Sequence, residues 1–354
     1  MTGLERRLRG AVVRVDLARA TGARHAWLRW QHDRTFSSQA ADRHVSVSRA
    51  LWREAAEALG ATFVELSPPF GEIRRGGANT RVMGETTVLN NLVSVGLADD
   101  KPLTHRLLSE AGLPTPEHVV AADRSAAEAF LARAHGPCLV KPARASGGDG
   151  ITGEVRTPHQ LRRAAREARR HDTEVLVELQ VPGEVYRVLV LDGQVLDVVR
   201  RRAPRVRGDG RSTIGELVTA EYERRLASAH DIPVKPFVVD LDCIFTLEAM
   251  GLRLDDVLPL GATAVVKTVS NFNRPDENEA VAEPAPGAFE RVAVEAASVL
   301  GLRLAGVDLV TAGAASADAV ILEVNGRPAL HHHRHVAGRG DRSPVAARLL
   351  EALL

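Results

Sequence analysis

Two apolar segments near the end of the chain each carry polar residues that a buried strand would not normally accept. Residues 305–312 read AGVDLVTA and contain Asp308, while residues 319–326 read AVILEVNG and contain Glu323 and Asn325. Glu323 and Asn325 are two positions apart, so in a strand both side chains point to the same side. Burying two carboxylates and an amide without partners is costly. The pattern predicts a pair of strands that hold Mg²⁺, because Mg²⁺ prefers oxygen ligands.

A lysine at the end of an apolar strand, followed by a flexible turn, is the second informative feature. The segment CLVKPARASGGDGI begins at residue 138 and contains Lys141, Gly147, Gly148 and Gly150. Glycines let main-chain N–H groups approach a polyphosphate, and the lysine supplies positive charge beside it. The segment is not a P-loop, because the lysine precedes the turn and no helix follows. A hairpin turn that simply requires glycine is the alternative interpretation.

A short hinge with an acidic residue on either side is the third feature. The strand predicted over residues 174–181 leaves through Val181-Pro182-Gly183, with Glu178 before the turn and Glu184 after it. Such carboxylates can accept hydrogen bonds from an adenine amino group and from ribose hydroxyls. The alternative interpretation is that both glutamates are simply solvated beside a turn.

Composition limits the classes of partner and compartment. The formal net charge of +1 gives no reason to expect nucleic acid or an anionic membrane as a partner. No apolar run is long enough to cross a membrane and no leader pattern is evident, so we expect a cytoplasmic protein. Cys138 and Cys243 are too few for a disulfide framework and are expected in the core. Only four lysines occur, namely Lys101, Lys141, Lys235 and Lys267, and the role of each is considered individually, because an ammonium group is not interchangeable with a guanidinium group at a phosphate oxygen.

Hydrophobic periodicity predicts an α/β chain in two units. Residues 1–98 are expected to form a small α/β lobe. Its predicted elements are strands over 11–17 and 61–66, a helix over 47–59 and a strand running into a helix over 80–97.

The second unit, residues 99–354, opens on a helix that ends at Gly112 and contains a hairpin that turns at Asp192-Gly193. The helix over 157–171 is expected to expose a face of arginines to solvent. The other predicted elements are helices over 125–134, 212–230, 244–252 and 288–302, and strands over 138–143, 174–181, 305–312 and 319–326.

Taken together, these blocks resemble the ATP-grasp superfamily of carboxylate–amine ligases. The likeness is strongest to the ATP-grasp region of cyanophycin synthetases and to the glutathione-synthetase half of bifunctional glutathione enzymes. The resemblance implies an ATP-grasp fold over 99–354, with a nucleotide-clamping subdomain at 99–177 and a larger subdomain with the metal site at 178–354. It rests on the blocks DDKPLTHRLLSEAGLPTP, LVKPARASGGDGIT, VLVELQVPGEVYRVLVLDGQVLDVVRRRAPRVRGDGRSTIGELV, TVSNFNRPDE, GVDL and ILEVNGRP.

The resemblance implies ATP and Mg²⁺ as cofactors and gives roles to residues at matching positions. The groups expected around ATP are Lys101 and Lys141 at the phosphates, Gly147, Gly148 and Gly150 in the covering turn, Glu178 with Leu179 to Val181 at the adenine, and Glu184 at the ribose. The implied ligands for two Mg²⁺ ions, which Mn²⁺ could replace, are Asp308, Glu323 and Asn325. The residues expected near the transferred phosphoryl group and substrate are Arg187, one of Arg200 and Arg201, Lys267, Asn271 and Asn273.

The implied reaction joins the carboxylate of an amino acid or small peptide to the amine of another amino acid. ATP phosphorylates the carboxylate, and the amine then displaces phosphate to give a dipeptide or γ-glutamyl amide. Such a product would fit natural-product biosynthesis with small amino acids as partners, and a homo-oligomer is allowed. The alternatives are a non-catalytic nucleotide-binding sensor, a ligase for a non-amino-acid amine, and a zinc hydrolase that uses the nearby histidines.

Two positions depart from D-alanine–D-alanine ligases, which resemble this chain less. Those enzymes carry an arginine two residues before the metal aspartate, where this chain has Gly306. They also carry a glycine after the proline of the last motif, where this chain has Ala329, so an oxyanion role for that main chain is in doubt.

Four histidines follow the last motif in the segment HHHRH, residues 331–335. Adjacent histidines in an extended segment alternate faces, and Mg²⁺ prefers oxygen, so a metal site is disfavoured. We expect His331, His333 and Arg334 to contact substrate, with a structural loop of locally paired histidines as the alternative. Replacing His331 or His333 is then predicted to raise KM for an amino acid and to leave ATP affinity unchanged.

Overall fold

The computed structural model of the chain has the α/β architecture that the sequence predicts. The predicted strand over 11–17 and residues Asn271 and Asn273 lie outside the part it describes. None of the described helices is both long and apolar enough to cross a membrane. The structure describes residues 25, 27, 30, 45–145, 147–228, 239–269, 277–281, 288–311, 318–334, 336–337 and 345–354.

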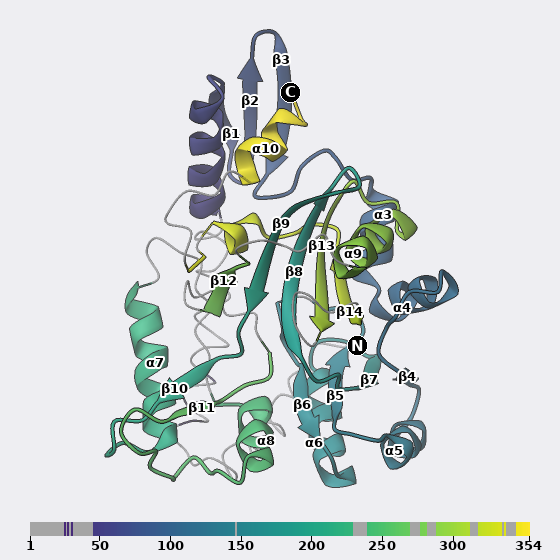
Figure 1. Ribbon diagram of the computed structural model, residues 1–354, viewed down its shortest axis with the longest axis vertical. Helices are drawn as coiled ribbons and strands as arrows, with labels where there is room; N and C mark the ends of the chain where they lie inside the picture. The colour runs from purple at the N-terminus through teal and green to yellow at the C-terminus, as the bar shows by residue number, and fades with distance from the viewer. Residues whose placement is uncertain are drawn as a thin grey trace.

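A five-stranded antiparallel sheet forms the centre of the molecule (Figure 1). Its central hairpin turns at Asp192 and Gly193, both with positive φ (47° and 75°), as predicted. In spatial order the strands are β12 (Asn278–Ala280), β9 (Gln194–Arg201), β8 (Glu184–Leu191), β13 (Leu304–Thr311) and β14 (Ala319–Asn325).

One face of this sheet is apolar and packs against helices. Side chains from alternate strand positions, such as Val188, Val198 and Val307, are fully or almost fully buried there. They share a core with Ala296 of α9 (Ala288–Val299) and with Leu108 of α4. The helices that contribute to this core are α3 (Leu92–Asp99), α4 (Lys101–Glu110) and α9. Neighbouring residues of these strands, such as Asp308, point to the other face.

A second, four-stranded sheet lies below the first in Figure 1. Its order is β4 (His118–Ala121), β7 (Val175–Leu179), β5 (Cys138–Pro142) and β6 (Thr152–Val155). The elements that share its core are α5 (Arg124–Arg133), α6 (Pro158–Ala168), α7 (Ile214–Ser228), α8 (Leu241–Ala249), β10 (Arg205–Arg207) and β11 (Thr263–Val265).

Both cysteines lie in the core of this second sheet, as expected. Cys138 and Cys243 are free thiols and fully buried. Burial raises the pKa of Cys138 to about 11 and raises that of Cys243 as well, so both thiols stay protonated and unreactive at neutral pH.

The N-terminal lobe is a three-stranded antiparallel sheet with a helix over residues 45–58. The middle strand was not predicted, although Gly76 and Gly77, both with positive φ, form the two-residue turn that signals a hairpin. The strands are β1 (Thr62–Ser67), β2 (Phe70–Arg75) and β3 (Ala78–Met83), and α10 (Val345–Glu351) lies beside them in Figure 1.

The apolar cores do not follow the boundaries expected between the units. Helix α3 spans position 98 and packs on the five-stranded sheet. Leu349 of α10 shares a core with Trp52 of the N-terminal lobe. Val206 and Phe245, expected in the larger subdomain, pack on the four-stranded sheet. The division at residues 98 and 177 stays a prediction.

Candidate functional site

The polar face of the five-stranded sheet brings together the residues expected to bind metal and phosphate. Strand register places Asp308 directly opposite both Glu323 and Arg187, and Gly306 opposite Asn325. Residues paired in this way point to the same face of a sheet. The two predicted carboxylates, the amide and an arginine therefore project from three neighbouring strands into one region.

Two buried arginines surround Asp308. Arg187 Nε and Nη2 donate to its two carboxylate oxygens at 2.5 and 2.7 Å, and Arg201 Nη1 lies 3.7 Å from Oδ2. Burial alone would raise the pKa of Asp308, but the charges of Arg187 and Arg201 outweigh it and hold that pKa below its usual value. The aspartate is therefore an anion at neutral pH, as a metal ligand must be.

Arg201 carries hydrogen-bonding capacity that the described residues do not use. Its side chain is 1% exposed, and within the described part of the chain its Nε and Nη2 atoms have no hydrogen-bond partner. Burial, together with the charge of Arg187, lowers its pKa to about 10, so it stays protonated at neutral pH. Buried donors in native proteins almost always find acceptors. Two such donors beside a surplus of positive charge fit an anionic ligand.

Gly306 makes room for the arginine that neutralises Asp308. A Cβ at position 306 would lie 3.1 Å from Arg187 Nη1 and 2.9 Å from Pro328 Cβ. The arginine that pairs with Asp308 thus comes from the adjacent strand, β8.

Changing Gly306 to alanine is expected to displace Arg187 and to destabilise the fold by about 1–3 kcal/mol, as overpacking does. Urea unfolding measures the loss of stability. Gly96→Ala is the control, since a Cβ there meets nothing within 4 Å in helix α3. Equal behaviour of the two variants would contradict this role for Gly306.

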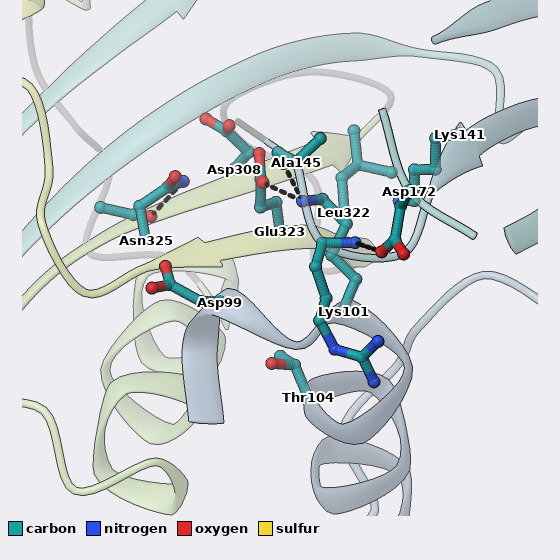
Figure 2. A network of polar contacts seen from close by, with 12 residues as sticks. Asp99, Lys101, Thr104, Lys141, Ala145, Asp172, Asp308, Leu322, Glu323 and Asn325 are labelled. Carbon is teal, nitrogen blue, oxygen red and sulfur yellow. Dashed lines mark hydrogen bonds and ion pairs between the residues drawn. The ribbon is translucent and has the colours of Figure 1, made fainter. Parts of the chain in front are cut away.

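The two lysines predicted to bind phosphate come from different elements: Lys141 from the four-stranded sheet and Lys101 from α4. Lys141 on β5 pairs with Glu178 on β7, with 2.8 Å between Nζ and Oε2 and both side chains 5% exposed. Lys101 is the first residue of α4, and its Nζ lies 2.5 Å from the Ala145 carbonyl and 3.2 Å from Glu323 Oε1. Figure 2 shows Lys101 directed to both partners. Lys101 therefore connects the glycine turn to the predicted metal ligands.

The glycine turn joins β5 to β6 and is fixed at its start. Gly147, Gly148 and Gly150 have φ of 71°, 79° and 75°, which side chains with a Cβ rarely adopt. Arg144 holds the entry to the turn, because its Nε donates to Asp100, the N-cap of α4, at 2.8 Å. The turn is thus tied to the same helix end that carries Lys101.

His105 lies between the two sheets as a neutral imidazole. Its Nδ1 is 3.4 Å from His118 Nδ1 on β4, and its Nε2 is 3.4 Å from the Leu322 carbonyl on β14. Burial, followed by the charge of Lys141, lowers its pKa to about 3. A neutral ring adds no further positive charge beside the lysines.

This depressed pKa predicts a loss of stability in acid. Above pH 6.5 neither folded nor unfolded His105 is protonated, whereas between pH 6.5 and about 3 only the unfolded state takes up the proton. His105 should therefore cost about 2 kcal/mol of stability between pH 7 and pH 5. Urea unfolding at both pH values should show a smaller loss for His105→Gln than for the wild type. The exposed His159→Gln is the control, and an unchanged loss in His105→Gln would refute the assignment.

The histidine segment is a 3-10 helix (Leu330–His333), not the extended segment that was assumed. Pro328 has no N–H to continue the strand ladder, so the chain turns after β14. His331 Nδ1 lies 2.6 Å from Glu85 Oε1, and His333 Nδ1 lies 2.7 Å from Asp197 Oδ2. Both histidines therefore pair with carboxylates that are distant in the sequence, and substrate contact remains a prediction.

His332, which the sequence did not single out, faces the arginine pair. Burial, followed by the charge of Arg201, holds its pKa well below the usual value. Its Nδ1 atom has no hydrogen-bond partner within the described residues. A neutral imidazole therefore lies beside the unused donors of Arg201. Arg334 instead extends from the segment to Glu54 at 2.5 Å.

Arg200 and Glu184 lie on the face opposite the predicted metal ligands. Neighbouring residues of a strand point to opposite sides, so only one of Arg200 and Arg201 can face Asp308. Arg200 Nη1 lies 2.6 Å from Glu184 Oε1, and the Tyr186 hydroxyl donates to Glu184 at 2.7 Å. Arg200 also pairs with Glu279.

Two other predicted residues have protein partners of their own. The Leu179 N–H donates to the Glu117 carbonyl at 2.8 Å within the sheet. Lys267 forms an ion pair with Asp240, the N-cap of α8, rather than with the carboxylates around Lys101 and Lys141.

Asp242 is a buried residue that sequence reasoning missed. It accepts hydrogen bonds from Gly153 N at 2.9 Å and from Thr268 N at 3.0 Å. Burial raises its pKa, but these donors, reinforced by the Thr268 hydroxyl at 2.6 Å, satisfy the carboxylate. It fixes the segment that carries Lys267 against β6. The other missed residues of the site are Glu85, His105, Asp197, Asp240 and His332.

The predicted metal ligands do not by themselves complete the coordination of a cation. Among the described residues no three histidine, cysteine or acidic side chains converge as a metal cluster. Asp308, Glu323 and Asn325 supply two carboxylates and one amide, and the amide nitrogen donates to the Gly306 carbonyl at 3.2 Å. Mg²⁺ sites of this kind are completed by substrate phosphates and water.

Comparisons with known proteins agree with the geometry. Residues 107–207 match the family model described as D-ala D-ala ligase C-terminus. A cyanophycin synthetase of Trichormus variabilis is 29% identical over 319 residues, covering 81% of this chain and 35% of that protein. The glutathione biosynthesis bifunctional protein of Enterococcus faecalis is 30% identical over 72% of this chain and 35% of its own length.

A solved structure supports the fold. The bifunctional glutathione synthetase from Pasteurella multocida superposes with a TM-score of 0.55 at 22% identity, over 87% of this chain and 44% of that one. The chain spans about a third of the length of the curated relatives named above.

Proposed function

Because the chain carries an ATP-grasp domain homologous to those of cyanophycin synthetases and bifunctional glutathione enzymes, we propose that it is an ADP-forming carboxylate–amine ligase. Its substrates are the carboxylate of an amino acid or small peptide and the amine of a second amino acid. One observation carries the proposal: buried Lys101 lies 3.2 Å from Glu323, with Asp308 facing that glutamate across the strand pair. The lysine that would bind phosphate is thus adjacent to the carboxylates that would bind metal.

ATP would lie between the two sheets, over the glycine turn. Lys101 and Lys141 would neutralise its phosphates, and both are buried where a charge acts strongly. Glu178 would approach the adenine amino group. Since the Leu179 N–H is already used, the main-chain contact to adenine is assigned to the Leu179 carbonyl and the Val181 N–H.

Asp308, Glu323 and Asn325 would hold divalent metal, and their chemistry fits the ion. Hard oxygen donors on two neighbouring strands leave coordination positions for phosphate oxygens. We assign two Mg²⁺ ions, which Mn²⁺ could replace. Bound metal would neutralise charge on the transferring phosphoryl group.

The reaction would proceed in two displacements. The substrate carboxylate attacks the γ-phosphorus of ATP and ADP leaves, which gives an acyl phosphate. The amine then attacks the acyl carbon, the C–O bond to phosphate breaks, and the amine loses a proton as the amide forms. Arg201, two of whose donors have no partner among the described residues, and Arg187 would bind the phosphate oxygens through both steps.

A pairwise amino-acid screen tests the proposal. Purified protein with ATP and Mg²⁺ is incubated with all pairs of amino acids and with common dipeptides, and ADP release and product mass are recorded. We expect ADP and phosphate only with a productive pair, together with a product mass equal to the two substrates less one water. ATP binding by calorimetry without ADP from any mixture would reject ligase activity and favour the nucleotide sensor.

A further inference from the structure

An apolar hollow lies between α5 and α6, on the face of the four-stranded sheet that these helices cover. Its volume is about 170 Å³. Val175 and Val177 of β7 form the floor, and the walls include Ala127 of α5 with Leu161 and Ala165 of α6. The hollow exists because alanines occupy positions where larger side chains would fill the space between the helices.

This hollow lies on the side of the sheet opposite the site described above. Strand register places Val177 opposite Val140 and Val119, whereas Glu178 pairs with Leu139 and His118 on the other face. The hollow is therefore separated from the proposed nucleotide by one layer of sheet. Nothing in the ligase proposal uses it.

The rim of the hollow is strongly basic. On α6, Arg162, Arg166 and Arg169 follow a spacing of four and three residues, which places them along one stripe of the helix. Arg124 of α5 completes the rim. Among the described lining residues Glu128 is the only acidic one, and it accepts from Arg124 at 2.7 Å and from Arg162 at 3.4 Å. The described lining thus contains four arginines and one glutamate, so its formal charge is net positive.

We propose that this hollow binds a small amphipathic anion, with an alkyl or aryl body in the cavity and a carboxylate at the arginine rim. A dry apolar cavity of about 150 Å³ is large enough to bind benzene, so this one accepts an apolar group of comparable size. The charge at the rim selects an anionic end over a neutral one, and guanidinium is the group best suited to carboxylate. The arginine face expected to be merely solvated thus has a binding function.

Isothermal titration calorimetry of the full chain with octanoate tests this inference. Octanol, which keeps the alkyl body without the charge, and acetate, which keeps the charge without the body, are the matched ligands. Octanoate should bind at least about tenfold more tightly than either, and added salt should weaken its binding. Equal affinity for octanoate and octanol, or no heat from octanoate, would overturn the proposal.

Two variants locate the site, with a third as the control. Ala165→Leu should fill the hollow and reduce octanoate affinity by about tenfold or more, while Arg169→Gln should weaken it by a smaller factor. Arg163→Gln removes an arginine from the same helix, one that lies over the Phe245 ring and not in the hollow, and should bind octanoate normally. If Ala165→Leu and the equivalent Ala127→Leu both fold and bind octanoate as the wild type does, the site lies elsewhere.

Discussion

Replacing Asp308 with asparagine is expected to lower the free energy of unfolding by about 3–5 kcal/mol, because it removes the carboxylate that pairs with two buried guanidinium groups. ADP formation should be lost as well, since the same carboxylate is a proposed metal ligand. Urea unfolding and a coupled ADP assay measure the two effects. Stability should fall in this way whether or not metal or ATP is added.

A surface ion pair of similar geometry is the matched control. Arg303 and Asp192 lie 2.7 Å apart, but both side chains are about half exposed. Asp192→Asn should cost less than about 1 kcal/mol and leave ADP formation unchanged. Adding Arg187→Gln to Asp308→Asn should recover part of the lost stability and none of the activity. If Asp308→Asn unfolded at the wild-type urea concentration, the buried charge cluster described here would be wrong.

The placement of the predicted metal ligands on one face of the sheet could be predicted, because it depends on local rules. Alternation along a strand puts Glu323 and Asn325 on one side, and an antiparallel partner brings Asp308 to the same side. The hairpin at Asp192-Gly193 follows from its turn residues in the same way. Such features require only the two-residue period of a strand and the conformational preferences of single residues.

Other features depend on register, which a single sequence does not specify. Either Arg200 or Arg201 could have faced the carboxylates, and only the pairing of Arg201 with Val185 and of Arg187 with Val199 places Arg201 on that side. A one-residue shift would have exchanged the two arginines. The sequence therefore limited the candidates to Arg200 and Arg201 but did not decide between them.

Long-range pairs were beyond the reach of sequence patterns. Glu85 and His331 are 246 residues apart, and Asp197 and His333 are 136 apart. Nothing in the local sequence of either histidine indicates which carboxylate it will meet. Asp197 could have been suspected, because it interrupts the apolar run over residues 195–199 and shares a strand face with Arg201.

Replacing Lys141 with methionine is expected to have the second large effect, on both folding and nucleotide binding. The change leaves Glu178 buried without the ammonium group 2.8 Å away, which should cost about 3–5 kcal/mol. ATP affinity should fall by about a hundredfold, corresponding to roughly 3 kcal/mol for a lost charge-assisted contact in a buried site. Urea unfolding and calorimetric titration with ATP measure the two losses.

A double variant separates the structural role of Lys141 from its proposed role at the phosphates. Lys141→Met with Glu178→Gln removes both charges, so most of the lost stability should return, because a neutral amide is far cheaper to bury than an unpaired carboxylate. ATP affinity should stay low in the double variant, since the cation that would meet the phosphates is still absent. Recovery of ATP affinity together with stability would instead mean that Lys141 serves only to neutralise Glu178, and that Lys101 is the only one of the two lysines that meets the phosphates.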